Sequence, residues 1–299
     1  MDLLSIEQLG KKQIQFLLSE SAKMEKLLKK AGHLPLKGKL IANMFFEPST
    51  RTNLSFQAAC KRLGAQSLEF CLSTSSCKKG ESFEDSIKML DSYADAIIIR
   101  HPNEGSASLA AKIASHPVIN AGDGAQSHPT QALIDLYTIK KLKGKIKGLN
   151  ITLLGDLKHA RAMRSLFIAL AMFNAKLTLV SPPGLEMEKS LVKKARAKFK
   201  AKIIETQEAD LCSCDILYTG RIQKERFSDS GQARLAQKKF HLSASQLKSA
   251  PKRMAVMHPL PRVDEIPKEF DSDPRAKYFM QAKNGVAVRM AILVHCLKK

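Results

Sequence analysis

The sequence predicts an α/β protein with two doubly wound parallel-sheet domains of similar size, joined by helices. The chain has 299 residues, enough for two domains of roughly 150 residues each. Short buried strands alternate with helical segments along most of its length, which is typical of parallel sheets covered by helices on both faces. The alternation restarts after a basic link at 143–148, so the strands fall into two groups.

The elements of the first half follow from apolar spacing and from turn residues. Ile14, Leu17 and Met24 lie near a helical period and predict a helix over 5–32. A buried strand at 40–46 leads into a helix that ends at Gly64. Ser82, with Asp85 three residues on, has the spacing of a helix cap. The other predicted elements are strands at 67–70, 96–100 and 117–120, a polar loop at 73–80 and a helix at 129–143.

The second half repeats the alternation. We predict strands at 149–155, 176–180, 202–204, 215–219 and 253–257, and helices at 160–173, 186–199 and 285–297. The domain boundary falls in or near the helix and link at 134–148, which gives domains 1–133 and 134–299. We expect the last helix to pack back toward the first domain.

The charge balance indicates anionic partners without naming them. The chain has 49 Lys and Arg against 28 Asp and Glu, a net charge of +21. Such a field attracts nucleic acid, phosphorylated metabolites and dicarboxylic acids alike. Nucleic-acid binding normally also shows basic stripes with interleaved aromatics, whereas this chain has no Trp, four Tyr and lysines spread over its length. A lysine-rich surface accounts for most of the excess.

Membrane, secretory and metal signals are absent from the sequence. No apolar run approaches the roughly 20 residues of a membrane span, and the N-terminus lacks the apolar core of a signal peptide. The six cysteines form no CxxC pair, and Cys212 and Cys214 make a lone CxC, whereas a zinc site needs two pairs or added histidines. We therefore expect a cytoplasmic protein with free thiols, no metal and no membrane contact.

Ligands of open parallel sheets bind beyond the carboxyl ends of the strands, so the residues after each strand are informative. Ser49, Thr50, Arg51 and Thr52 follow the first strand and open a helix. Three hydroxyls, a guanidinium and the N–H groups of a helix start suit a phosphate. Read alone, the same residues could be only a helix cap with a surface arginine.

The other strand ends also carry cationic or neutral donors. Arg100 alone could be a surface ion-pair partner, and His128 alone could cap a helix. Together, the strand ends predict a cleft for small, multiply anionic ligands, one of them phosphorylated. The segments concerned are RHP at 100–102, NAGDG at 120–124 with HPTQ at 128–131, GDLKHAR at 155–161, TGRIQ at 219–223 and HPLPR at 258–262.

The ordered segments FFEPSTRT, KKGES, RHP, NAGDG, HPTQ, GDLKHAR, RIQKER and HPLPRVDEI resemble the aspartate/ornithine transcarbamoylase family. The match runs from about residue 40 to the last helix. STRT with HPTQ is shared by the family in general, whereas HPLPR, GDLKHAR and RIQKER point to aspartate as acceptor. The resemblance implies transfer of the carbamoyl group of carbamoyl phosphate to the amino group of L-aspartate. The products would be N-carbamoyl-L-aspartate and phosphate, in de novo pyrimidine biosynthesis.

The resemblance also implies roles for individual residues. It makes 1–133 the carbamoyl-phosphate-binding domain and 134–299 the aspartate-binding domain. Ser75 and Lys79 come from the neighbouring subunit in the family, so a homotrimer with shared active sites is implied, and Lys79 would contact both substrates. Glu47 would pair with Arg161 and Arg226 and favour domain closure, although it could be only a carboxylate at a helix start. Carbamoyl phosphate would be bound by Ser49, Thr50, Arg51, Thr52, Ser75, Lys79, Arg100, His128 and Gln131, and aspartate by Lys79, Arg161, Arg221, Gln223, Leu260 and Pro261.

The implied chemistry needs no metal, cofactor or covalent intermediate, because the uncharged α-amine attacks the carbamoyl carbon directly. Thr52, Arg100 and His128 would donate hydrogen bonds to the developing oxyanion. Arg51 and Lys79 would stabilise the leaving phosphate. The catalytic set is then Arg51, Thr52, Lys79, Arg100, His128 and Gln131.

Two positions depart from the family, and two other functions stay in view. Family members commonly have Arg and Glu where this chain has Asn53 and Gln57, so an amide pair replaces a charge pair. HPLPRVDEI resembles chains that join separate zinc-bearing regulatory subunits, but it leaves such a partner open. The alternatives are a transcarbamoylase for ornithine, which Arg161 and Arg221 disfavour, and a nucleic-acid-binding protein on a retired enzyme scaffold.

Overall fold

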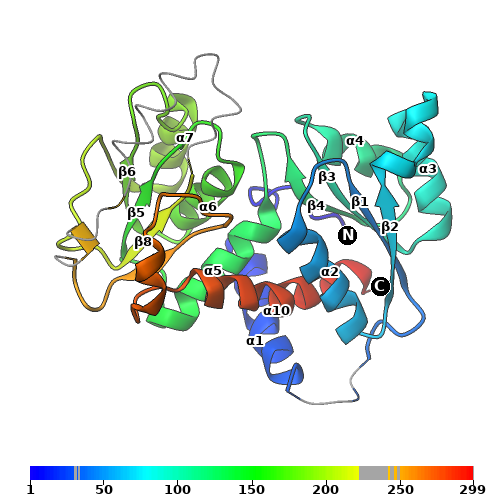
Figure 1. Cartoon of the computed structure of the whole chain (residues 1–299), viewed down its shortest axis with the longest axis horizontal. Coiled ribbons are helices and arrows are strands. Elements are labelled where there is room, and N and C mark those ends of the chain that lie inside the picture. The colour runs from blue at the N-terminus through cyan, green and yellow to red at the C-terminus, as the bar shows by residue number, and fades with distance from the viewer. Residues whose placement is uncertain (30–31, 33, 222–241, 243–245, 248–249, 299) are drawn as a thin grey trace. The chain divides into compact units, whose positions relative to one another are not determined.

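The computed structural model describes residues 1–29, 32, 34–221, 242, 246–247 and 250–298. The chain divides into two compact units, each built on a parallel sheet with helices (Figure 1). Unit 1 comprises Met1–Tyr137 and Asn284–Lys299, and unit 2 comprises Thr138–Lys283. This architecture confirms the predicted fold class. The chain passes between the units twice, once inside the helix Pro129–Lys143 and once inside the helix Tyr278–Leu297.

Unit 1 has a four-stranded parallel sheet in the order β2-β1-β3-β4. Its strands are β1 (Leu40–Phe45), β2 (Gln66–Cys71), β3 (Ala96–His101) and β4 (Val118–Asp123). Its helices are α1 (Lys11–Leu27), α2 (Thr50–Arg62), α3 (Phe83–Tyr93) and α4 (Ser106–Ile113), with the start of α5 (Pro129–Lys143) and most of α10 (Tyr278–Leu297). Two short 3-10 helices, η1 (Leu72–Thr74) and η2 (Ser76–Lys79), occupy the predicted polar loop.

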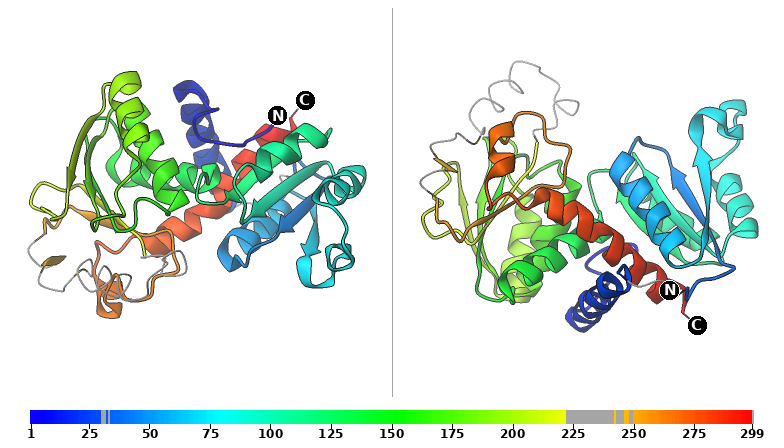
Figure 2. Two further views of the ribbon diagram at one scale, coloured as in Figure 1. Left: turned by 90° about the horizontal axis from the view of Figure 1, so that it is seen from above. Right: turned by 60° about the horizontal axis from the view of Figure 1, so that its bottom comes forward.

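Unit 2 has a five-stranded parallel sheet in the order β7-β6-β5-β8-β9. Its strands are β5 (Asn150–Leu154), β6 (Lys176–Val180), β7 (Lys202–Thr206), β8 (Ile216–Thr219) and β9 (Ala255–Met257). The helices α6 (Arg161–Met172) and α7 (Lys189–Phe199) and the 3-10 helix η4 (Lys268–Ser272) accompany them. Figure 2 shows the twist of both sheets from two further directions.

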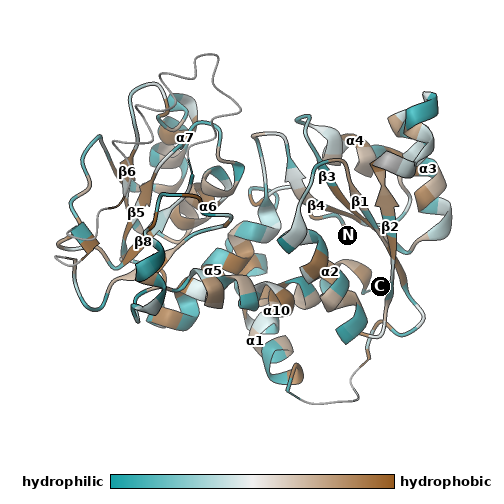
Figure 3. Ribbon diagram, in the orientation of Figure 1, coloured by the Kyte–Doolittle hydropathy of each residue, from teal (hydrophilic) through white to brown (hydrophobic). Residues whose placement is uncertain are grey.

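The strands β1, β3 and β4 of unit 1 are buried on both faces, as their largely apolar sequences predict. On one face, Ala42 and Ile97 pack against Ile87 of α3 and Ala107 of α4. Successive strand residues point to opposite faces, so Ile41 and Ile98 face the other way, and they too are fully buried. Figure 3 shows apolar colouring along the strands of each sheet.

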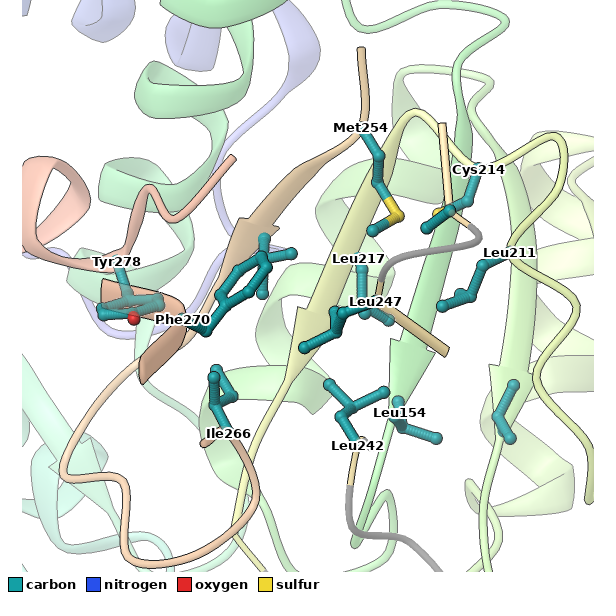
Figure 4. Close-up of a cluster of buried hydrophobic side chains, with 13 residues drawn as sticks. Leu154, Leu211, Cys214, Leu217, Leu242, Leu247, Met254, Ile266, Phe270 and Tyr278 are labelled. Carbon is teal, nitrogen blue, oxygen red and sulfur yellow. The ribbon is translucent and has the colours of Figure 1, made fainter. Parts of the chain in front are cut away.

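One face of the unit 2 sheet carries a separate apolar cluster (Figure 4). Leu154 and Leu217 of the strands belong to the same cluster as Phe270 of η4 and Tyr278 of α10. The cluster holds the segment 258–278, which follows β9, against the sheet. It contains Leu154, Val180, Leu211, Cys214, Leu217, Leu242, Leu247, Ala250, Met254, Val256, Ile266, Phe270 and Tyr278.

Three predicted helices begin three or more residues away from their predicted starts, and the one predicted at 186–199 begins at Lys189. The first begins at Lys11 rather than Ser5, because Gly10 is its extended N-cap and Gln13 Oε1 accepts from the Gly10 N–H at 3.1 Å. Ile6 and Leu9 lie before this helix and are buried by other contacts. The last helix begins at Tyr278, seven residues before the predicted start at Gly285. The sequence prediction also missed α4.

The predicted cap of α3 is confirmed. Ser82 is the N-cap, and its hydroxyl accepts a hydrogen bond from the Asp85 N–H at 3.0 Å. This bond satisfies one of the N–H groups that the first turn of a helix leaves without an intrahelical acceptor.

Gly155, directly after β5, lies where the ends of β5 and β8 approach each other closely. Its φ is +132°, and a Cβ there would lie 2.6 Å from the Gly220 carbonyl oxygen after β8. We expect Gly155→Ala to lower the free energy of unfolding by at least ~2 kcal/mol more than the control Gly184→Ala does. Gly184 also has a positive φ, +83°, but open space around it. Urea unfolding of both variants measures the difference, and equal losses would contradict the close approach.

Candidate active site

The strand register of unit 1 brings three candidate loops together at the carboxyl ends of its strands. Phe45 of β1 is opposite Arg100 of β3, and the Phe46 N–H donates to the Arg100 carbonyl at 2.8 Å. His101 of β3 is in turn opposite Asp123 of β4. Since all strands are parallel, the segments that follow β1, β3 and β4 leave the sheet side by side.

The segment after β1 becomes the first turn of α2. Ser49 is the N-cap residue, yet its side chain makes no capping hydrogen bond. The first intrahelical bond runs from the Asn53 N–H to the Ser49 carbonyl at 3.1 Å, so the N–H groups of Thr50 to Thr52 precede the helical ladder. A helix cap therefore does not explain the Ser49 hydroxyl.

The side chains of Thr52 and Arg51, in this first turn of α2, differ in exposure. Thr52 is buried, with 6 % of its surface exposed. Arg51 reaches solvent, but partial desolvation lowers the pKa of its guanidinium. A poorly hydrated cation at a helix start favours an anion. Further along α2, the Gln57 amide donates to Asn53 Oδ1 at 3.0 Å, so the predicted amide pair forms.

Arg100 and Glu47 form an ion pair within unit 1. Arg100 Nε lies 3.2 Å from Glu47 Oε2, and the side chains are only 16 % and 22 % exposed. The carboxylate orients the guanidinium at the end of β3. His101, the next residue, makes contacts within the fold. Its ring packs edge-on against Phe46, and its Nδ1 lies 2.9 Å from Ser106 Oγ.

His128 and Gln131 sit at the start of α5. The His128 carbonyl accepts from the Gln131 N–H at 3.1 Å, and its ring is buried, with Nδ1 3.4 Å from Thr130 Oγ1. The Gln131 side-chain amide donates to Asp135 Oδ1 at 2.8 Å. Asp135 is fully buried one turn further along the helix. An acid that the sequence reading did not single out therefore orients Gln131.

Arg289 of α10 is a second residue that sequence reasoning missed. It is 3 % exposed, its guanidinium lies 4.8 Å from the Phe56 ring centroid, and a Cβ on Gly285 would lie 2.7 Å from its Nη1. Burial lowers the pKa of Arg289 to about 9, with the Asp135 charge opposing and the Arg100 charge reinforcing that shift. It is still cationic at neutral pH. For Asp135, the only signal in the sequence was its position four residues after Gln131 on a predicted helix.

Ser75 and Lys79 lie apart from these residues in sequence, on the turns that follow β2. Ser75 separates η1 from η2, and its hydroxyl donates to the Leu72 carbonyl at 3.1 Å. Lys79 ends η2, is exposed, and precedes Gly80 in the left-handed conformation. β2 is an outer strand that pairs with β1, with Cys71 opposite Phe45, so among the described strands these turns have only β1 as a neighbour.

In unit 2 the carboxyl ends of the neighbouring strands β5, β8 and β9 lie side by side. Leu154 is opposite Thr219, and Tyr218 is opposite Met257. The segments that begin at Gly155, Gly220 and His258 therefore leave the sheet together. Arg161 opens α6 after the first of these, and Arg221 follows the second; both are partly buried. His159, between Asp156 and Arg161, is held by Asp156 through its N–H and its Nδ1, at 2.9 and 3.1 Å.

The segment after β9 is held by internal hydrogen bonds. Leu260 has a positive φ of +57°, and its peptide bond to Pro261 is cis. The Leu260 N–H donates to His258 Nδ1 at 2.8 Å. Arg262, also in this segment, forms a bidentate ion pair with Asp271 and lies 2.9 Å from the Tyr278 hydroxyl. Gln223 and Arg226, the remaining predicted site residues, lie outside the described residues.

Comparisons with known proteins cover nearly the whole chain. Residues 1–141 match the family "Aspartate/ornithine carbamoyltransferase, carbamoyl-P binding domain", and residues 147–296 match its "Asp/Orn binding domain". The chain is 48 % identical over 296 residues to the "Aspartate carbamoyltransferase catalytic subunit" of Thermococcus onnurineus, covering 98 % of this chain and 95 % of the relative.

Two solved structures are also similar. One is aspartate transcarbamoylase from Trypanosoma cruzi in complex with carbamoyl phosphate and aspartate, with a TM-score of 0.93, 38 % identity, and 98 % and 95 % of the two chains covered. The other is the catalytic subunit of M. jannaschii aspartate transcarbamoylase, with a TM-score of 0.89, 43 % identity, and 98 % and 96 % covered.

The chain belongs to the aspartate/ornithine carbamoyltransferase family. The full-length matches confirm both the predicted resemblance and the predicted enzyme class. The enzyme transfers the carbamoyl group of carbamoyl phosphate to L-aspartate.

Among the described helices, none combines the length and the apolar composition needed to cross a membrane. Within the same part of the chain, no group of three or more His, Cys, Asp or Glu side chains could hold a metal ion.

The buried charges of Asp135 and Arg289 should depend on each other. We expect Asp135→Asn to lower the free energy of unfolding by about 3 kcal/mol or more, because Arg289 loses a buried countercharge. Arg289→Met should suppress part of that loss, so that the double variant loses less than the two single variants added together. Urea unfolding of the three variants measures this coupling.

The exposed Asp85 provides the control for this cycle. Asp85 lies 3.7 Å from Lys88 on the surface, so Asp85→Asn should cost less than about 1 kcal/mol. Strict additivity of Asp135→Asn and Arg289→Met would contradict the coupling.

Proposed function

We propose that unit 1 binds and activates carbamoyl phosphate, that unit 2 binds L-aspartate, and that the product N-carbamoyl-L-aspartate enters de novo pyrimidine biosynthesis. The observation that carries this proposal is the edge of the unit 1 sheet. There, the parallel register groups the start of α2, Arg100 and the His128 loop. These are donors for a phosphate and for a carbonyl oxygen, with one carboxylate to orient them.

The phosphate end of carbamoyl phosphate binds at the start of α2. The hydroxyls of Ser49, Thr50 and Thr52 and the N–H groups of the first turn donate to its oxygens. Arg51 supplies the countercharge, and its partial desolvation strengthens the attraction. Because Ser49 makes no capping bond, its hydroxyl is available as a donor.

Arg100, His128 and Thr52 donate to the carbamoyl oxygen, and Gln131 contacts the carbamoyl group. The uncharged amine of aspartate attacks the carbamoyl carbon, and the carbonyl oxygen becomes an oxyanion that these donors stabilise. Loss of one such donor typically costs about 10²–10³ in rate. The C–O bond to phosphate then breaks, Arg51 and Lys79 stabilise the leaving phosphate, and the phosphate accepts the proton of the amine.

Aspartate binds through its two carboxylates and its amine. Arg161, Arg221 and Gln223 meet the carboxylates, and Lys79 contacts them as well. The backbone carbonyl of Leu260 accepts from the amine, and Pro261 borders it. Both arginines leave the same sheet edge as Leu260, which supports a common ligand. We assign Glu47 and Arg226 to domain closure, with Glu47 passing from Arg100 to Arg161 and Arg226 as the substrates bind.

We further propose a cytoplasmic homotrimer in which Ser75 and Lys79 act in the site of the neighbouring subunit. Lys79 is exposed on turns that follow the edge strand β2. The name "catalytic subunit" of the relative supports an assembly of several chains, with separate regulatory chains as candidates. Cysteines in the free thiol form suit a reducing compartment.

A carbamoyl-transfer assay with aspartate and ornithine side by side tests the substrate roles. We expect product with aspartate alone. Arg51→Ala should lower kcat by at least about 10³-fold, and Arg221→Ala should chiefly raise the KM for aspartate. Arg62→Ala, at the opposite end of α2, and Arg196→Ala, on α7, are exposed controls that should behave like wild type. Near-normal turnover of Arg51→Ala would refute the phosphate site.

Mixed trimers test whether the site is shared. Arg51→Ala and Lys79→Ala are each expected to be inactive. Chains of both variants, unfolded together in equal amounts and refolded, should recover about a quarter of wild-type activity, because in a closed ring some sites combine an intact Arg51 with a neighbour's intact Lys79. Arg51→Ala mixed with His128→Ala should recover nothing, since both residues belong to one subunit. No recovery in either mixture would contradict the shared site.

A further inference from the structure

The imidazole of His258 lies behind the Leu260 backbone in unit 2. His258 directly follows β9, and its side chain is 1 % exposed. The backbone N–H of His258 donates to Gln281 Oε1 of α10 at 2.9 Å, and Gln281 is also buried. The backbone of His258 is therefore anchored at the end of the sheet from which the predicted aspartate ligands extend, and the ring is buried there.

The hydrogen bonds of the ring define its tautomer. The Leu260 N–H donates to Nδ1 at 2.8 Å, so Nδ1 must present a lone pair. The ring proton is then on Nε2, which lies 3.3 Å from Glu265 Oε1. The Nε2–H bond to a carboxylate keeps the proton on that side of the ring.

Glu265 is equipped to remain a carboxylate although it is buried, with 5 % of its surface exposed. Burial raises the pKa of its carboxyl group, but hydrogen bonds from His258 and from the backbone outweigh burial and bring the pKa to about 2. Two of these bonds come from the Val263 and Asp264 N–H groups, at 2.7 and 2.8 Å to Oε2. One oxygen thus faces the backbone, and the other faces the ring.

We propose that His258 is a positioning residue for the acceptor amine: Glu265 fixes its tautomer, and its Nδ1 holds Leu260 in the conformation that aims the Leu260 carbonyl at aspartate. This inference rests on the proposed function of the Leu260 carbonyl.

The backbone of Leu260 needs such a restraint. Leu260 lies in the left-handed region at φ +57°, a conformation that is unfavourable for a residue with a Cβ atom. Such conformations persist when surrounding bonds determine them. The bond to Nδ1 fixes the N–H of Leu260 and therefore also limits where its carbonyl points.

Two variants of His258 separate the two ring nitrogens. His258→Asn places an amide oxygen near the position of Nδ1 and keeps an acceptor for the Leu260 N–H. His258→Gln reaches toward Glu265 and loses that acceptor. We expect His258→Gln to raise the KM for aspartate by about tenfold, the effect of one lost hydrogen bond, and His258→Asn to raise it by less than about threefold. The KM for carbamoyl phosphate should stay unchanged in both.

Glu265→Gln tests the tautomer without touching His258. Its amide oxygen must face the Val263 and Asp264 N–H groups, so its NH₂ group faces Nε2 and donates to it. The ring proton then moves to Nδ1, against the Leu260 N–H. We expect the KM for aspartate to rise as in His258→Gln, and we expect His258→Asn to suppress that rise in the double variant. Unfolding midpoints measured alongside separate this effect from a loss of stability.

The outcomes distinguish this inference from the proposed function. If wild type is active and Arg221→Ala raises the KM for aspartate, while His258→Gln and Glu265→Gln do not, the positioning role is wrong and the proposed function stands. Equal effects of His258→Asn and His258→Gln, or failure of the double variant to recover, would also overturn the positioning role. If Arg221→Ala has no effect on aspartate, the proposed aspartate site itself is wrong.

Discussion

Parallel strand pairing is the constraint on which the rest of the structure depends. In an antiparallel sheet, neighbouring strands run in opposite directions, so the segments that follow them leave from opposite ends of the strands. Here Phe45 pairs with Arg100 and Leu154 with Thr219 in parallel register, so every strand ends at the same edge of its sheet. Residues that are far apart in sequence, such as Thr52 and His128, are brought to one edge by backbone pairing alone. Side-chain contacts are needed only to orient them.

Buried acids provide that orientation in both units. In unit 1, Asp135 accepts from the Gln131 amide, and its charge acts on the buried Arg289. In unit 2, Glu265 faces His258, which in turn accepts from the Leu260 N–H. Asp135 contacts the predicted ligand Gln131 directly, whereas Glu265 acts on Leu260 through His258. A charge that is buried and hydrogen-bonded has few alternative positions, so it holds its neighbour in one orientation.

The sequence predicted the strands and the strand-end residues well, because both depend on local patterns. The strand at 176–180 and the helix at 129–143 have the predicted bounds, and Ser82 caps α3 as expected. The first helix was predicted too long, because the extended backbone of its N-cap Gly10 delays the start to Lys11. Asp135, Arg289 and Glu265 were missed, since nothing local shows that a charged side chain will be buried.

The sequence by itself determined the family, the order of the elements and which residue types follow each strand. These properties are encoded within a few neighbouring positions or within motifs such as STRT and HPLPR. Only the tertiary structure decided which of those residues share a sheet edge, which charges are buried and which ring nitrogen of His258 carries the proton. Those outcomes depend on partners more than a helical turn away along the chain, whose distance and desolvation arise only when the sheets have formed.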